Sequence, residues 1–317
     1  MSTSMNDVVF ELYRELTERE AKTRVQASCK QKLKKLINPA KLFPWVKKKV
    51  TLHIKSMMCG KHYSDDYAGP NVFTPTDKVF PEARIAVYYV ITGGYDDFKL
   101  PFYVDDELDY YLFTDSETAS HMNMPANFRV LPVPESLSGL SNAKKNRYMK
   151  LHPDEVLSEA VTGKKYDYTI YIDSSMRITC DIKPLVYSLI ASGKSIAVHN
   201  HRVRDCIYDE GQQIWIFGRL DRRSIWEQLD FYRSEGMPKH FGLLENTVLI
   251  RKSNDSQLQD IMHQWWQQIE RFTHRDQLSL PYVLWKNGLD MSYIFSLGTN
   301  VWDNPYFLYY PHNRYSH

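Results

Sequence analysis

The hydrophobic pattern of the chain changes near Pro81 from helical spacing to short apolar runs. Before it, Val9, Leu12 and Leu16 recur on one helical face, and residues 6–38 contain no Gly or Pro, which predicts a helix. After it come runs of strand length, rich in β-branched and aromatic residues: Arg84–Thr92, Leu108–Thr114, Phe128–Val133, Tyr166–Ile172, Ser195–His199 and Thr247–Arg251.

Helical patterns lie between these runs. Residues 184–192 begin with a proline in the first turn and stop before Gly193, residues 221–234 stop near Gly236, and residues 255–272 carry apolar side chains at helical spacing. Strands that alternate with helices predict an α/β fold with a mostly parallel central sheet flanked by helices. We place the domain boundary near Pro81, with a basic helical extension over residues 1–80 and the α/β domain over residues 81–317.

Charge is distributed unevenly along the chain. Between Ala21 and Ser64 there are twelve Lys or Arg and no Asp or Glu, although the whole chain carries only +2, so the remainder is acidic. The segment 21–64 predicts contact with an anionic membrane surface or with an acidic partner protein. The acidic remainder shows no recognised nucleic-acid-binding motif, so no nucleic acid is expected as a partner.

Targeting and cysteine patterns point to a reducing compartment. The N-terminus lacks a basic start followed by an apolar core, and no run of about 18 apolar residues occurs. The four cysteines show neither a CxxC nor a Cys/His pair, which argues against a zinc site and a disulfide framework. We expect a cytoplasmic protein, with peripheral attachment to the inner face of the membrane as the predicted role of the extension.

Polar residues follow the first two predicted strands. In a parallel α/β sheet, ligands bind outside the carboxyl ends of the strands, which here carry Thr92, Gly93, Tyr95 and Asp115. Gly93 lets the backbone approach a ligand, Tyr95 can stack on a base, and Asp115 can accept hydrogen bonds from a base or ribose. A simple turn at Gly93 and a turn cap at Asp115 remain open alternatives.

Asp173 is the strongest candidate, because it follows a buried-looking strand and a buried carboxylate needs a counter-charge. Mg²⁺ or Mn²⁺ bridging a diphosphate would supply that charge. The alternative is a capping aspartate for the turn 174–177. Upstream, Arg147 and Lys150 stand at i, i+3 on one helical face, where they can neutralise phosphate or form a solvated basic face.

The order of these motifs resembles that of the GT-A glycosyltransferases. More narrowly, it resembles a glycosyltransferase-domain family formerly catalogued as a domain of unknown function and seen in polysaccharide assembly. The resemblance covers roughly residues 82–290. It is carried by the turn 91–96, the strand end 113–115, Arg147 with Lys150, and the segments 166–178, 199–210, 244–251 and 274–282.

The resemblance implies a donor site for a nucleoside diphosphate sugar, with Asp173 beginning a DxD-like motif that holds a divalent cation, Mn²⁺ or Mg²⁺. The third position of the motif is Ser175 rather than Asp, which leaves weak metal binding or neutralisation by Arg147 and Lys150. His312 is similar to the late histidine that completes the metal shell in several GT-A enzymes.

The resemblance also implies contacts to the sugars. Asp276 and Gln277 resemble an Asp-Gln element near the donor sugar, where Asp276 can bind sugar hydroxyls or act as a general base. Glu245 and Asn246 precede a predicted strand, where the resemblance places acceptor or sugar contacts. A surface ion pair is the alternative for Glu245.

Two further residues are candidates by position. His201 and Arg204 lie just beyond the carboxyl end of the run 195–199, from which they can contact acceptor or phosphate. The alternative is that both are ordinary polar residues at the edge of the core and contact no ligand.

The predicted function is hexosyl transfer from a nucleoside diphosphate sugar to a saccharide or lipid-linked saccharide, in surface polysaccharide or glycoconjugate assembly. The serine at the third DxD position motivates the alternative, a non-catalytic saccharide-binding or scaffold protein on the same fold. A nucleotidyltransferase would show Arg and Lys beside a Gly-rich loop after the first strand, and residues 92–95 lack these cations.

Overall fold

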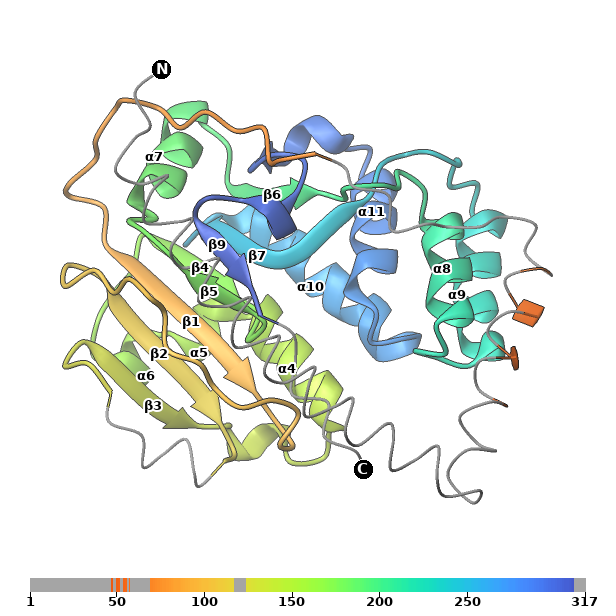
Figure 1. Ribbon diagram of the computed structural model, residues 1–317, viewed down its shortest axis with the longest axis horizontal. Coiled ribbons are helices and arrows are strands. Elements are labelled where there is room, and N and C mark those ends of the chain that lie inside the picture. Colours follow the sequence, from red (N-terminus) through yellow and green to blue (C-terminus); the bar gives the residue numbers. More distant parts are fainter. Residues whose placement is uncertain are drawn as a thin grey trace.

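A seven-stranded sheet forms the centre of the protein (Figure 1). The computed structural model describes residues 69–116 and 124–310, with six separate residues between 47 and 57. In spatial order the strands are β3 (Phe128–Pro132), β2 (Asp109–Thr114), β1 (Ile85–Ile91), β4 (Tyr168–Ile172), β7 (Leu244–Lys252), β6 (Ile196–Asn200) and β8 (Phe295–Ser296). A second sheet pairs β5 (Met176–Ile178) with β9 (Phe307–Tyr309).

The central sheet is mostly parallel, as predicted. Only β7 runs against its neighbours β4 and β6, with Ile172 opposite Val248 in the first pair. Because β7 is antiparallel, its amino end lies at the same edge as the carboxyl end of β4. This one reversal brings residues 173 and 245–247 together, although more than seventy positions separate them along the chain.

Both faces of the sheet are buried, which explains why β1 is apolar throughout rather than alternating. On one face, Tyr88 and Val90 pack with side chains of the larger helical layer. On the other face, Val87 and Tyr89 pack against one helix and the small sheet.

The larger helical layer contains α4 (Asn142–Leu151), α5 (Pro153–Val156), α8 (Ile207–Ile216), α9 (Arg222–Ser234), α10 (Ser256–Arg271) and α11 (Asp276–Lys286). The opposite face is covered by α7 (Lys183–Ser192), while α6 (Glu159–Thr162) precedes β4. Single 3-10 turns occur at Glu135–Leu137, Met291–Tyr293 and Val301–Asp303.

The six predicted strands and the predicted helices 184–192, 221–234 and 255–272 are confirmed, with ends that shift by a few residues, and the predicted helix 6–38 lies outside the described residues. β7 begins at Leu244, so Glu245 and Asn246 lie inside the strand and do not precede it as predicted. The sequence did not predict the longer helices α8 and α11, the short helices α5 and α6, or the strands β5, β8 and β9. α11 contains Pro281, and α8 contains Gly211 close to a Leu229 side chain, so both carry a residue typical of a helix break.

The described part of the predicted extension packs on the sheet domain. The Asn71 amide donates to the Asp303 carbonyl at 2.7 Å, and the Thr76 amide donates to Ser188 Oγ at 2.9 Å. Phe73 meets Phe295 edge to face. The boundary near Pro81 stays a prediction, and these contacts show that residues 69–80 lie against the domain that follows them.

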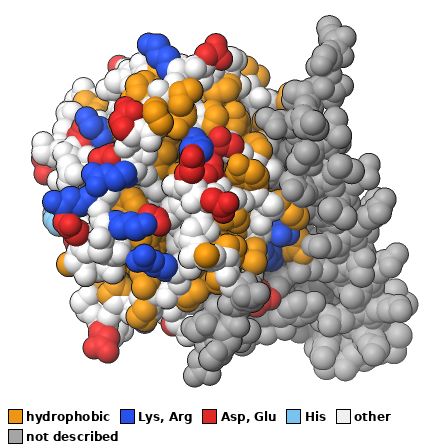
Figure 2. Space-filling view, turned by 90° about the vertical axis from the view of Figure 1, so that its left-hand side faces the viewer, with side chains coloured by type: hydrophobic (Ala, Val, Ile, Leu, Met, Phe, Trp, Pro, Cys, Tyr) orange, Lys and Arg blue, Asp and Glu red, His pale blue; other side chains and the backbone are white. Residues whose placement is uncertain are grey.

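Lysine and arginine side chains intermingle with acidic ones on the face shown in Figure 2, so the described residues there form no patch of one sign.

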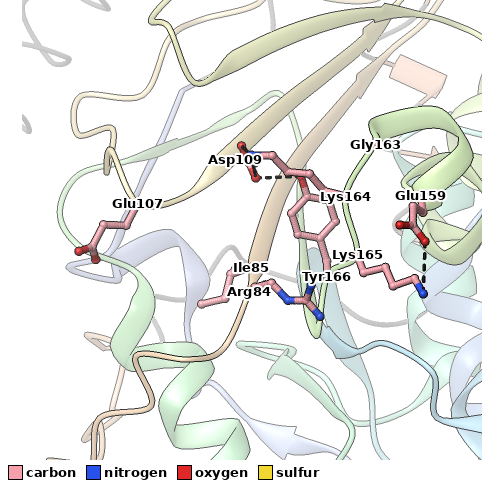
Figure 3. A pocket seen from close by; sticks show the side chains of 9 residues that line it. All are labelled: Arg84, Ile85, Glu107, Asp109, Glu159, Gly163, Lys164, Lys165 and Tyr166. Atoms are coloured by element: carbon pink, nitrogen blue, oxygen red, sulfur yellow. Dashed lines mark hydrogen bonds and ion pairs between the residues drawn. The ribbon is translucent and has the colours of Figure 1, made fainter.

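A hollow of about 420 Å³ opens at the amino ends of β1 and β2 (Figure 3). Lys164 binds the Asp109 carboxylate at 2.7 Å and Lys165 pairs with Glu159, so local partners already neutralise these charges. Among the described residues, no helix is long and apolar enough to span a membrane.

Candidate active site

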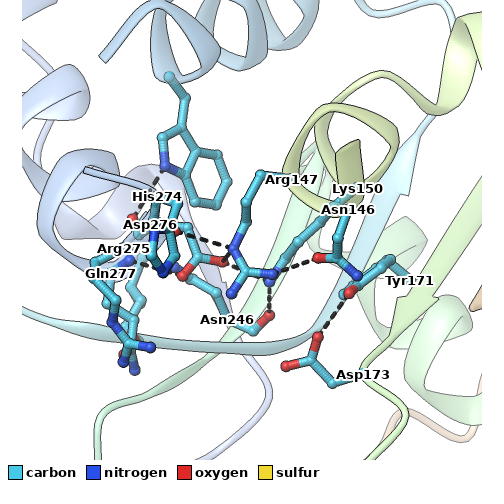
Figure 4. A network of polar contacts seen from close by, with 12 residues as sticks. Asn146, Arg147, Lys150, Tyr171, Asp173, Asn246, His274, Arg275, Asp276 and Gln277 are labelled. Carbon is cyan, nitrogen blue, oxygen red and sulfur yellow. Dashed lines mark hydrogen bonds and ion pairs between the residues drawn. The ribbon is translucent and has the colours of Figure 1, made fainter. Parts of the chain in front are cut away.

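A buried network of charges lies where the carboxyl end of β4 meets the amino ends of β7 and α11 (Figure 4). Its centre is Lys150, of whose side chain 1% is exposed. The Lys150 ammonium donates to Asp276 Oδ2 at 2.7 Å and to the Asn246 carbonyl at 2.5 Å, and it lies 4.8 Å from the centre of the Tyr171 ring. Lys150 therefore connects α4, β4, β7 and α11.

A second buried cation, Arg251, binds the backbone carbonyl of Lys150. Arg251 Nη1 donates to the Lys150 carbonyl at 2.6 Å, and Tyr88 Oη donates to the same oxygen at 2.9 Å. Burial raises the pKa of Tyr88 to about 12, so its hydroxyl stays protonated. These contacts hold the carboxyl end of α4 against the sheet.

Asp276 is held as an anion between two cations. Besides Lys150, Arg147 Nε lies 3.4 Å from Asp276 Oδ2 and donates to the His274 carbonyl at 3.2 Å. Burial by itself would raise the pKa of the Asp276 carboxyl, but Arg147 and Lys150 outweigh it and hold that pKa well below its usual range. Asp276 is therefore suited to orienting Arg147 and Lys150, and it is a weak base at neutral pH.

Asp173 lies beside this network. Its amide donates to the Thr247 carbonyl at 2.8 Å, and its Oδ1 accepts a hydrogen bond from the Tyr171 hydroxyl at 2.7 Å. Burial and the Asp173 charge raise the pKa of Tyr171 well above its ordinary value, so the phenol remains a donor. Burial by itself would lower the pKa of Arg147. The charges of Asp276 and Asp173 outweigh burial and raise this pKa above its ordinary value, so the guanidinium stays charged.

The residues after β1 and β2 form a tight turn against α4. Thr92 Oγ1 donates to the Asn142 carbonyl at 2.8 Å, and the Gly93 amide donates to both oxygens of Asp115 at 2.9 and 2.8 Å. Gly93 has φ +66°, and a Cβ there would meet Asn142 Nδ2 at 2.0 Å. Asp115 thus caps the turn, the alternative left open by the sequence, while Tyr95 extends outward with 64% of its surface exposed.

Glu245 and its neighbours form the other side of the site. Glu245 Oε2 lies 3.9 Å from His201 Nε2, and 13% of the Glu245 side chain is exposed. Burial, together with the charges of Glu210 and Asp173, raises the pKa of Glu245 from its ordinary 4.5 to about 7. Glu245 is therefore not the surface ion pair of the open alternative, and it exchanges a proton near neutral pH.

Asn246 and Gln277 complete the wall between β7 and α11. Asn246 is buried, and neither its Oδ1 nor its Nδ2 has a hydrogen-bond partner. Gln277 Nε2 donates to the Leu244 carbonyl at 3.4 Å, and Gln277 Oε1 accepts from Arg275 Nη2 at 3.3 Å. The Asn246 amide is thus enclosed beside the network, and the described residues supply no hydrogen-bond partner for it.

Part of the chain matches a family of known proteins. Residues 149–301 match the family model described as TOD1/MUCI70, glycosyltransferase-like domain. This match confirms the predicted resemblance. The matched segment contains Lys150, Asp173, Glu245 and Asp276, and the turn after β1 lies outside it.

The chain is also similar to a curated protein. The probable hexosyltransferase MUCI70 of Arabidopsis thaliana is 24% identical over an alignment of 221 residues, and the match covers 63% of this chain and 37% of that protein. The chain thus spans little more than a third of the length of this relative.

Two solved structures of glycosyltransferases are partly similar to the chain. The galactosyltransferase LgtC, in complex with donor and acceptor sugar analogues, gives a TM-score of 0.38 at 14% identity, over 67% of this chain and 72% of that chain. Mouse xyloside xylosyltransferase 1 gives a TM-score of 0.40 at 10% identity, over 67% of this chain and 84% of that chain.

A metal site in the glycosyltransferase-like domain is not complete in the described ranges 69–116 and 124–310, which contain no group of three His, Cys, Asp or Glu placed to hold an ion. Asp173 Oδ1 already accepts from Tyr171, and the carbonyl of the buried Ser175 accepts from the Tyr310 amide at 2.6 Å. His312 lies outside the described residues. The divalent cation therefore stays a prediction.

The structure brings most predicted site residues together and adds others. Arg147, Lys150, Asp173, Glu245 and Asp276 share one electrostatic environment. This is shown by the ion pairs of Asp276 and by the effect of Asp173 and Asp276 on the pKa values of Arg147 and Glu245. Four contributors were missed: Asn142, Tyr171, Glu210 and Arg275. Asn142 lies four residues before Asn146 and eight before Lys150. This helical spacing alone indicated that the three side chains share one face of the helix.

Proposed function

We propose that this chain transfers a hexose from a nucleoside diphosphate sugar to a saccharide or lipid-linked saccharide acceptor. The observation that carries the proposal is the buried network of Lys150, Arg147, Asp276 and Asp173 at the ligand-binding edge of the sheet, in a chain that matches a glycosyltransferase-like domain. Buried charges of this kind are costly to assemble and concentrate at functional sites.

Arg147 is the group best placed to meet a diphosphate. Its side chain is 18% exposed, whereas Lys150 is enclosed at 1%. When the bond from the sugar to the diphosphate breaks, negative charge builds on the departing oxygen, and a preoriented guanidinium stabilises it. Asp276 holds Arg147 and Lys150 in place before the substrate arrives. A divalent cation at Asp173 would share this role as a Lewis acid.

Glu245 is the group best suited to the acceptor side. Its pKa of about 7 means that the carboxyl takes up or releases a proton at physiological pH, which is the property a general base needs. Asp276 lacks this property because its two cations hold it ionised. In the proposed reaction, Glu245 accepts the acceptor hydroxyl proton and Asp276 orients cations.

Nucleotide binding and turnover test the proposal directly. We expect UDP or GDP to bind in calorimetry, with and without Mn²⁺, and one of a panel of sugar nucleotides to be consumed. Asp173→Asn should reduce turnover at least tenfold, whereas the same change at the exposed Asp230 of α9 should have no effect. Absence of any nucleotide binding, or full turnover in Asp173→Asn, would contradict the proposal.

A non-catalytic saccharide-binding role is the second candidate. It is favoured by Ser175 at the third position of the DxD-like motif, where its side chain is buried and supplies no carboxylate. Under this alternative, the protein binds a saccharide without consuming any sugar nucleotide. Detectable turnover by the pure protein excludes it.

We also propose that the basic segment 21–64 attaches the protein peripherally to the cytoplasmic face of an anionic membrane, where lipid-linked acceptors reside. The support comes from its charge and from three described residues. Val50, Ile54 and Met57 are exposed at 51%, 51% and 65%, at the i, i+4, i+7 spacing of one helical face. An exposed apolar face within a basic segment suits the boundary between lipid headgroups and acyl chains.

A further inference from the structure

A second charged cluster, formed by His201, Arg204 and Glu210, lies next to Glu245. Glu210 of α8 is buried, and its Oε2 accepts a hydrogen bond from Arg204 Nε at 2.7 Å. The same Oε2 lies 3.9 Å from His201 Nε2, as does Oε2 of Glu245. A single imidazole nitrogen therefore faces two carboxylates that come from different elements of the fold.

Backbone contacts fix the orientation of the His201 ring. The amides of Val203 and Arg204 approach Nδ1 at 3.3 and 3.0 Å. Nδ1 accepts from these two amides, and Nε2 on the other side of the ring faces Glu210 and Glu245. Burial and the nearby Arg204 and Arg202 lower the pKa of His201 to about 3, so the ring is neutral throughout the physiological range.

The distances show what this ring does. A separation of 3.9 Å is too long for a hydrogen bond, so His201 spaces the two carboxylates without neutralising either. Arg204 Nε donates to Glu210, and Arg204 Nη2 also lies 3.3 Å from His201 Nε2. These contacts place the Glu210 carboxylate beside the His201 ring that Glu245 also faces.

Charged groups from three elements face Glu245. Glu210 comes from α8, Asp173 from the end of β4, and Asp276 with Arg275 from the start of α11. The balance is negative, since Arg275 is the one cation among these groups and Asp276 is already paired with Lys150. Burial and Glu210, ahead of the other carboxylates, raise the pKa of Glu245.

We propose that Glu210, clamped by Arg204, is a positioning residue that acts across His201 on Glu245 and promotes proton uptake by that carboxylate. The inference rests on the proposed function. In the reaction, the acceptor O–H bond breaks and its proton goes to Glu245, while the acceptor oxygen bonds to the anomeric carbon. The bond from that carbon to the diphosphate breaks, and its electron pair leaves with the phosphate oxygen.

Glu210→Gln tests the inference, because it removes the negative charge and retains the shape. We expect the pKa of Glu245 to fall by about one unit, since a like charge within a few ångströms has been removed. A ¹³C-carboxyl NMR titration reads this value directly, with the Glu245 signal assigned by its loss in Glu245→Gln. The acid limb of the pH profile of kcat/KM should move to lower pH by the same amount.

Matched variants separate electrostatics from structure. Glu210→Asp keeps the charge and should restore most of the Glu245 pKa, whereas Glu227→Gln removes an exposed carboxylate of α9 and should leave it unchanged. If Glu210→Gln does not fold because Arg204 is left unpaired, the double variant Arg204→Gln/Glu210→Gln removes both charges and should show a fall in the same direction but smaller, because the loss of the Arg204 cation opposes it.

Failure of the positioning role of Glu210 can be distinguished from failure of the proposed function. An unchanged Glu245 titration in folded Glu210→Gln, or in the double variant, overturns the positioning role even if the enzyme is active. A shifted titration in a protein that consumes no sugar nucleotide leaves the coupling intact and overturns the proposed function instead.

Discussion

Glu245→Gln is expected to stabilise the folded protein at alkaline pH. The substitution replaces a buried carboxyl by a neutral amide of the same shape. In the wild type, ionisation of Glu245 is opposed by burial and by Glu210 and Asp173, which raise the pKa of Glu245 from 4.5 to about 7. The amide of the glutamine variant does not ionise, so the folded variant does not carry the cost of a buried negative charge beside Glu210 and Asp173.

The sign and size follow from proton linkage. Because the folded pKa is higher than the unfolded one, Glu245 favours folding below about pH 4, and this contribution is lost as pH rises through about 7. A difference of about 2.5 pKa units corresponds to roughly 3 kcal/mol in the free energy of unfolding. The advantage of the glutamine variant should therefore be under about 1 kcal/mol at pH 5 and reach roughly 3 kcal/mol at pH 8.

Urea unfolding followed by tryptophan fluorescence at pH 5, 6, 7 and 8 measures this difference. Glu227→Gln, at an exposed position of α9, is the control and should differ from wild type by the same small amount at every pH. A difference between Glu245→Gln and wild type that does not grow with pH would show that Glu245 ionises at its ordinary pKa. We also expect lower transfer activity, because the variant has no base at this position.

Three further predictions concern the network, the first turn and the extension. Asp276→Asn leaves the enclosed Lys150 unpaired and should lower the free energy of unfolding by roughly 3–5 kcal/mol at pH 7. Asp230→Asn should cost less than about 1 kcal/mol, and equal urea midpoints for the two variants would contradict the buried pairing. The depressed pKa of Asp276 means that its contribution is present at neutral pH and is lost as pH falls below about 4. Gly93→Ala should lower the melting temperature of the protein more than Gly94→Ala. Both glycines have positive φ, but only the methyl group added at Gly93 would meet Asn142. Equal changes in melting temperature for the two variants would exclude this contact. Flotation with anionic liposomes should be lost when residues 1–64 are deleted, and unchanged flotation would reject the membrane role of segment 21–64.

Local patterns in the sequence were enough to find the strands and several site positions. β1 and β4 are continuous apolar runs because both faces of the sheet are covered, so Thr92 and Asp173 could be located at strand ends from the sequence alone. Arg147 and Lys150 could be placed on one helical face because a helix has a fixed period.

The partners of these residues could not be found in the same way. Lys150 meets Asp276 across 126 positions and Asn246 across 96, and no local period connects such distant residues. The sequence pattern did not single out Glu210, because its place in the cluster depends on Arg204, His201 and Glu245, which converge from separate parts of the chain.

The sequence by itself determined the six main strands, the mostly parallel sheet, the basic segment and the position of Asp173 directly after β4, where we predict the site. The tertiary structure alone decided which carboxylate is a permanent anion and which exchanges a proton near pH 7. Asp276 and Glu245 have the same chemical group, and their pKa values diverge because one is packed between Arg147 and Lys150 while the other is buried facing Glu210 and Asp173. Such a difference arises from distances in space, which residue type and spacing along the chain do not encode.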